Sequence, residues 1–98
     1  MSKKYFVLKL NPSRPDFAQT MNDEERSIMQ QHVVYWREHM SKGRVLVFGP
    51  VLHPDAVYGL GIVCVDDEAQ VRDFIAGDPA HTINSYEYHP MLAVVPEK

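Results

Sequence analysis

The sequence predicts an α+β fold of the ferredoxin-like type, with its elements in the order β-α-β-β-α-β. Four short runs rich in β-branched and aromatic residues are interleaved with two helical patterns. Each helical pattern has a capping residue near its start and a glycine near its end. This order gives an antiparallel sheet with both helices on one face. The 98 residues suffice for one core, so we expect residues 1–98 to form a single domain.

The first predicted strand is followed by an unusually long loop. Residues 3–10, KKYFVLKL, favour a strand that Pro12 ends. Residues 11–20 contain two prolines and no periodicity, which predicts a loop. Loops of this length often bind ligands. Two interpretations stay open: Arg14 and Phe17 contact a substrate, or Arg14 is solvated while Phe17 packs on the edge of the core.

The first predicted helix spans residues 22–42. Asn22 is a suitable N-cap, Glu25 stands three residues later, and Gly43 is a natural C-terminal position. One apolar stripe runs along the helix, formed by Met29, Val33, Trp36 and Met40. His32 lies on the flank of this stripe. We therefore expect its imidazole to face the interior.

The second half of the chain predicts a hairpin, a helix and a last strand. Residues 44–52 and 60–66 are apolar runs joined by a turn, so they should pair as antiparallel neighbours. Residues 66–77 form a second capped helix pattern. Residues 85–95 predict a final strand that is interrupted or bulged near Pro90.

The predicted strands are apolar on both faces. In the second strand, for example, Val45 and Val47 alternate with Leu46 and Phe48. Two helices can cover only one face of the sheet, and an antiparallel face open to water should be largely polar. An exposed apolar face across several strands would exceed what a monomer usually tolerates. We therefore expect a homodimer in which a second copy packs against the sheet.

Composition and motifs argue against several classes of function. The net charge is −3 and basic residues form no run, so we expect no nucleic-acid partner. We find neither a signal peptide nor a membrane span and expect a cytoplasmic protein without membrane contact. Histidine spacing fits no metal site, and nucleophile-elbow and phosphate-loop motifs are absent. We therefore expect no metal and no other cofactor.

Acid–base chemistry remains, for which His32 needs a carboxylate partner. Asp78 is the leading candidate, because it follows a helix-ending glycine and precedes Pro79 in a turn. Simpler interpretations stay open for both residues. A buried histidine is often only a core residue with one hydrogen-bond partner, and Asp78 can simply close an Asx-turn.

Four segments, EERSIMQQHVVYW, GRVLVFGPV, GDPA and YEYHPM, carry a resemblance to the YciI-like (YCII-related) family of small dimeric α/β-barrel proteins. The resemblance covers nearly the whole chain. It implies that His32 and Asp78 form a polar pair in a cleft and that Gly49 and Pro50 shape the wall of this cleft. It also implies an enzyme without a settled substrate. The loop NPSRPDF departs from shorter members, and we expect it to fold over the cleft and bring Arg14 near the substrate.

These features predict a cofactor-independent enzyme that transfers a proton on a small cyclic or aromatic molecule, as a lyase or an isomerase does. Asp78 would orient His32 and stabilise its charge, and His32 would move the proton. Other predicted substrate contacts are Arg14, Phe17, Tyr35, Trp36, Gly49 and Pro50. The alternatives are a module that binds a small metabolite without changing it, an assembly partner, and an enzyme whose substrate itself activates oxygen.

Overall fold

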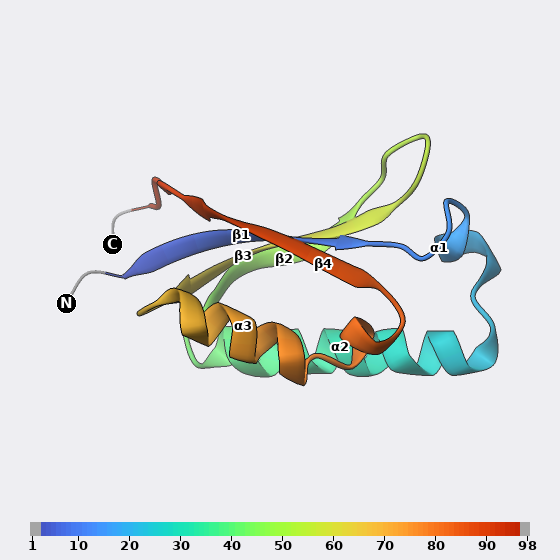
Figure 1. The fold of residues 1–98 in the computed structure, drawn as a ribbon, viewed down its shortest axis with the longest axis horizontal. Helices are drawn as coiled ribbons and strands as arrows, with labels where there is room; N and C mark the ends of the chain where they lie inside the picture. Colours follow the sequence, from blue (N-terminus) through green and yellow to red (C-terminus); the bar gives the residue numbers. More distant parts are fainter. Residues whose placement is uncertain (1–2, 97–98) are drawn as a thin grey trace.

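The computed structural model describes residues 3–96 and has one antiparallel sheet with helices on one face (Figure 1). The strands are β1 (Lys4–Asn11), β2 (Val45–Val51), β3 (Tyr58–Val65) and β4 (Ser85–Met91), and they lie in the order β2-β3-β1-β4. The helices are α1 (Phe17–Thr20), α2 (Asp23–Ser41), α3 (Glu68–Gly77) and the 3-10 helix η1 (Pro79–Thr82). Helices α2 and α3 run along the same face of the sheet. The predicted ferredoxin-like α+β fold is confirmed.

The core lies between this sheet and the two long helices. Alternate residues of β1 point inward, and these are Phe6, Leu8 and Leu10. They pack with buried residues of β2, β3, α2 and α3, namely Val45, Val63, Val65, Trp36, Val71 and Phe74. The buried side of α2 is narrower than the sequence predicted, because Trp36 is its only buried residue and Val33 and Met40 are exposed.

The segment after β1 differs from the predicted loop. Strand β1 continues to Asn11, and Phe17–Thr20 form the single helical turn α1. The backbone N–H groups of Gln19 and Thr20 both donate to the carbonyl oxygen of Asp16, which closes this turn. Phe17 is buried. The turn therefore has its own hydrogen bonds and one apolar anchor.

The last strand is shorter and more regular than predicted. Strand β4 ends at Met91, and Pro90 pairs with Phe6 without a break in register. Because β4 is an edge strand, the missing N–H of Pro90 need not interrupt the ladder. The irregularity of this sheet lies in β2 instead, where the register shifts between Val45 and Val47.

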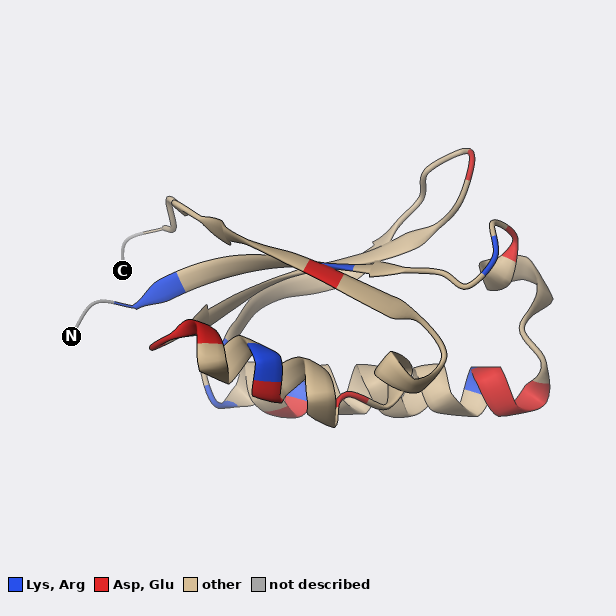
Figure 2. Ribbon diagram, viewed as in Figure 1, with Lys and Arg blue, Asp and Glu red and all other residues tan. Residues whose placement is uncertain are grey.

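Charged residues lie mostly on the helices and connections, whereas the strands carry few (Figure 2). Strands β2 and β3 contain none. On the face of the sheet that no described helix covers, Leu46 and Val47 are exposed. Within residues 3–96, no helix has both the length and the apolar character that a bilayer span requires.

Candidate functional site

Capping interactions fix the start of helix α2 and the turn that contains Asp78. At the start of α2, Glu25 N–H donates to Oδ1 of Asn22 at 2.8 Å and Asn22 N–H donates to Oε1 of Glu25 at 2.9 Å. This is the predicted capping box. At the far side, Asp78 lies between α3 and η1, and its Oδ1 accepts from Ala80 N–H at 2.9 Å. Asp78 therefore closes an Asx-turn.

Asp78 also meets three side chains from distant parts of the chain. Nδ1 of His32 lies 2.8 Å from Oδ2 and 3.0 Å from Oδ1 of Asp78. The indole Nε1–H of Trp36 donates to Oδ2 at 2.8 Å, and the Tyr86 hydroxyl donates to the same oxygen at 2.5 Å. Asp78 is only 1% exposed. A buried carboxylate with this many donors is well satisfied.

These contacts fix the protonation of the carboxylate and the phenol. Burial opposes ionisation of Asp78, but the hydrogen bonds from His32 and Tyr86 outweigh it and hold the pKa of Asp78 below its ordinary value. Burial and the nearby charge of Asp78 raise the pKa of Tyr86 far above its ordinary value. At neutral pH Asp78 is therefore an anion and Tyr86 a hydrogen-bond donor.

The orientation of His32 follows from this carboxylate. An ionised Asp78 can only accept, so Nδ1 of His32 carries a proton and donates it to Asp78. In the neutral imidazole Nε2 then has the free lone pair. Nε2 makes no hydrogen bond to any residue between 3 and 96 and is not sealed from solvent. It is available to a molecule bound beside it.

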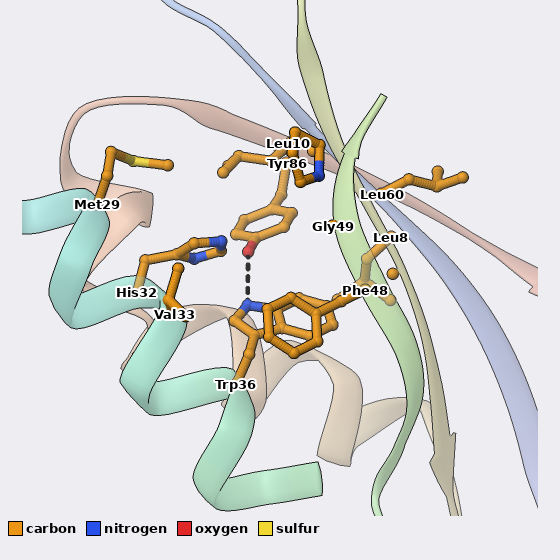
Figure 3. A pocket seen from close by; sticks show the side chains of 13 residues that line it. Leu8, Leu10, Met29, His32, Val33, Trp36, Phe48, Gly49, Leu60 and Tyr86 are labelled. Atoms are coloured by element: carbon orange, nitrogen blue, oxygen red, sulfur yellow. Dashed lines mark hydrogen bonds between the residues drawn. The ribbon is translucent and has the colours of Figure 1, made fainter. Parts of the chain in front are cut away.

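His32 lines a cavity of about 190 Å³ between α2 and the sheet. Figure 3 shows His32, Trp36 and Tyr86 converging on one side of it, with the Trp36 indole nitrogen bonded to the Tyr86 hydroxyl at 3.2 Å. The remaining walls are mostly apolar and include Leu8, Leu10, Met29, Val33, Phe48 and Leu60. The site therefore combines one accessible ring nitrogen with an apolar chamber.

Gly61 lets the Trp36 ring lie against the backbone of β3. A Cβ atom at position 61 would stand 2.3 Å from the six-membered ring of Trp36 and 3.2 Å from Cβ of Phe48. Trp36 also stacks on Phe48, with ring centroids 5.3 Å apart and an interplanar angle of 32°. The absence of a side chain at Gly61 therefore permits this close packing of Trp36.

Four of the predicted site residues line the cavity, and these are His32, Trp36, Gly49 and Pro50. Asp78 lies behind His32 and Trp36. Tyr35 lies outside the cavity: its hydroxyl donates to the carbonyl oxygen of Phe74 at 2.7 Å, and its ring packs at a tilt against His39. Its position favours a packing role.

The two predicted residues of the 11–20 segment also lie outside this cavity. The guanidinium of Arg14 donates to both carboxylate oxygens of Glu25 at 2.9 Å and lies 5.1 Å over the Phe17 ring. Phe17 lines a neighbouring hollow that shares Leu10, Met29 and Gly59 with the His32 cavity. The segment therefore borders the site, while Arg14 is bound to Glu25.

Tyr86 is the residue that the sequence did not single out. The only available signal is the alternation in β4, which points Tyr86 and Tyr88 to the side of the helices. Nothing local shows that Tyr86 reaches a carboxylate eight positions earlier. Among the described residues, no group of three His, Cys, Asp or Glu side chains is placed to hold a metal ion.

Comparisons with known proteins agree with this fold. The YCII-related domain model matches residues 5–94. No curated protein matches the sequence. The structure is similar to the crystal structure of a variant of SnoaB, a cofactor-independent oxygenase from Streptomyces nogalater. The TM-score is 0.52 at 16% sequence identity, over 99% of this chain and 100% of that chain. At this identity the likeness concerns the fold alone. Because the family model covers nearly the whole chain, the protein belongs to the YCII-related domain family.

Proposed function

We propose that this protein is a cofactor-independent acid–base enzyme, in which His32 and Asp78 transfer a proton on a small cyclic or aromatic molecule. The observation that carries the proposal is the bond from Nδ1 of His32 to Asp78 together with a free Nε2 in an apolar cavity. A general base needs this combination of an oriented ring and an accessible lone pair. The reaction class would be an elimination or an isomerisation.

The proton balance of such a step is simple. A C–H or O–H proton of the bound molecule moves to Nε2 of His32, and its electron pair stays on the molecule. The imidazolium that forms is stabilised by Asp78, which remains ionised. His32 then returns the proton to a second atom of the molecule in an isomerisation, or to a leaving group in an elimination. Tyr86 and Trp36 position Asp78 throughout.

A second candidate is an oxygenase without cofactor. SnoaB, which has a similar fold, is described as such an enzyme. In such a reaction, loss of a proton to His32 would make the bound molecule electron-rich enough to react with dioxygen directly. Oxygen uptake during turnover distinguishes this reaction from isomerisation and elimination, which consume no oxygen.

Replacing His32 by Gln tests the proposal. A library of small cyclic and aromatic compounds is first screened for stabilisation of the wild-type protein and for chemical change. We expect turnover to fall about 100-fold or more in His32→Gln, with the fold retained. His53→Gln is the matched control, because this side chain lies in the connection between β2 and β3, is 49% exposed and does not line the cavity. Unchanged turnover in His32→Gln contradicts the proposal, and ligands that bind but return unchanged favour a binding module.

We also propose that the working unit is a homodimer formed through the open face of the sheet. Leu46 and Val47 are exposed on this face, and by the register Val7 and Ile62 lie on the same side. Covering such a face with a second copy removes apolar surface from water.

Light scattering on Val47→Asp tests the dimer. Val34→Asp is the control, because Val34 and Val47 are equally exposed at 57% but Val34 lies on helix α2. We expect a dimer for the wild type and for Val34→Asp and a monomer for Val47→Asp. A monomeric wild-type protein contradicts the proposal.

A further inference from the structure

The cavity beside His32 has no charged wall. None of its thirteen lining residues is Lys, Arg, Asp or Glu. Arg14, the basic residue that the sequence predicted near the substrate, is bound to Glu25 by two hydrogen bonds of 2.9 Å. An anionic group in the cavity would therefore lose its water shell without gaining a cationic partner, which is costly.

The side chains around the cavity also offer only one free hydrogen-bonding atom. The Trp36 indole N–H and the Tyr86 hydroxyl both donate to Asp78. Nε2 of His32 is the remaining polar atom, and in the neutral ring it accepts a proton. A molecule that fits this site presents one acidic hydrogen to Nε2 and apolar surface elsewhere.

The net charge of the site favours a ligand that binds in its neutral, protonated form. With a neutral ligand beside the neutral form of His32, the site contains the single negative charge of Asp78. Proton transfer to His32 then leaves the new anion beside an imidazolium, and the total charge is unchanged. A ligand that arrives as an anion would instead bring a second negative charge into a site with low dielectric. Such a ligand would require His32 to take up a proton from solvent.

The volume of the cavity accommodates a small ring system. Its volume of about 190 Å³ exceeds only slightly the about 150 Å³ of an apolar cavity that holds benzene. Phe48 and the Trp36 ring stack at one wall, with centroids 5.3 Å apart. Gly59 and Gly61 lie on the neighbouring strand β3, where Leu10 and the Trp36 ring pack against them. One ring, or two fused rings, can lie flat in this space.

We propose that the His32 cavity selects an uncharged aromatic molecule of one or two fused rings that carries a single acidic hydroxyl, of the phenol or enol type, and excludes aromatic carboxylates and phosphates. This inference rests on the proposed function, because it assigns the proton acceptor of that reaction as the only polar contact of the ligand. Phe48 determines the upper size of the ring system.

Matched pairs of ligands test the charge preference. Phenol and a naphthol are neutral at neutral pH, whereas benzoate and the matching naphthoate are anions. Trp36 is the only tryptophan of the chain, so one indole N–H resonance in an NMR spectrum reports directly on this cavity. We expect the neutral member of each pair to shift this resonance and to bind at least about tenfold more tightly in calorimetry.

Several results would overturn the inference. The inference is wrong if the carboxylates bind as tightly as the neutral compounds or more tightly. It is also wrong if neither member of a pair binds, or if a compound binds without shifting the Trp36 indole resonance. Phe48→Ala tests the size limit, since it should raise the affinity for naphthol relative to phenol, and an unchanged ratio contradicts the role of Phe48. An anionic substrate turned over through His32 would refute this inference alone. Neutral ligands that bind without any proton exchange would refute the proposed function alone.

Discussion

Asp78 accepts a hydrogen bond from Nδ1 of His32 at 2.8 Å, although 46 positions of the chain separate the two residues. Helix α2 supplies the imidazole, and the junction between α3 and η1 supplies the carboxylate. His32 is 11% exposed at its side chain and Asp78 is fully buried. The carboxylate end of the pair is thus shielded from water, whereas Nε2 of His32 is accessible.

Asp78→Asn should disturb the orientation of His32. The amide keeps the shape of the carboxylate, but its NH₂ group can face the donors that now point at Asp78. We expect a loss of about 1–3 kcal/mol in the free energy of unfolding and a fall in turnover of about 100-fold or more. NMR of the imidazole nitrogens should show Nδ1 protonated in the wild type and a mixture of tautomers in the variant. An unaltered tautomer would show that Asp78 does not orient the ring.

Tyr86→Phe should weaken the support of Asp78 without removing its charge. Loss of this hydrogen bond to a charged group is expected to cost about 1.5–3 kcal/mol of unfolding free energy. Tyr88→Phe is the matched control on the same face of β4, because the Tyr88 hydroxyl donates to Glu68 at an exposed position. The control should change stability by less than about 0.5 kcal/mol.

The Tyr86 substitution also has a pH signature. The pKa of Asp78 lies below its ordinary value in the folded protein, so its contribution to stability is present at neutral pH and is lost as the pH falls through the folded pKa. Without the Tyr86 hydrogen bond the pKa of Asp78 is less depressed. Urea unfolding across the acid range should then show a smaller loss of stability, which is complete at a higher pH than in the wild type. Identical pH profiles of stability for the wild type and Tyr86→Phe would argue against the hydrogen bond from Tyr86 to Asp78.

Gly61→Ala should displace Trp36. The added Cβ would meet the indole at 2.3 Å, and overpacking of this kind costs about 1–3 kcal/mol. Gly49→Ala is the control in the same cavity wall, because a Cβ there has no neighbour within 4 Å. We expect Gly49→Ala to be neutral in urea unfolding, whereas Gly61→Ala should also shift the indole N–H resonance. Equal stability of the two variants would contradict the close packing.

Arg14→Gln should change stability in acid. The hydrogen bond from Arg14, followed by the backbone N–H of Asn22, lowers the pKa of Glu25 from 4.5 to about 2. A carboxylate with a depressed pKa stabilises the fold above its unfolded pKa, and this contribution is lost as the pH falls through the folded value. The wild type should therefore exceed Arg14→Gln in stability at neutral pH, and the gap should close between pH 4.5 and 2.

Arg26→Gln provides the comparison for this experiment. Arg26 pairs with Asp23, whose side chain is fully exposed, so its removal should have little effect at any pH. The measurement is the urea midpoint at successive pH values. A stability gap between the wild type and Arg14→Gln that persists undiminished to pH 2 would mean that Glu25 is not its source.

Much of the fold could be predicted because its signals are local. Periodicity and end signals in the sequence indicate the order of strands and helices, and the capping box of Asn22 and Glu25 is as predicted. The predicted ends of the elements were less accurate. The last strand was predicted to extend to residue 95, but β4 ends at Met91. The predicted apolar stripe on α2 contained more residues than are buried, because burial of Val33 and Met40 depends on how the helix lies on the sheet.

The candidate site follows partly from local sequence signals and partly from tertiary contacts. Local signals predicted that His32 faces inward and that Asp78 lies in a turn, because helical periodicity and Asx geometry are properties of neighbouring residues. The tertiary structure alone decided that Tyr86 and Trp36 meet Asp78 and that Arg14 binds Glu25. Those contacts join distant segments. They follow from strand order, register and helix packing, which no local pattern of residues specifies.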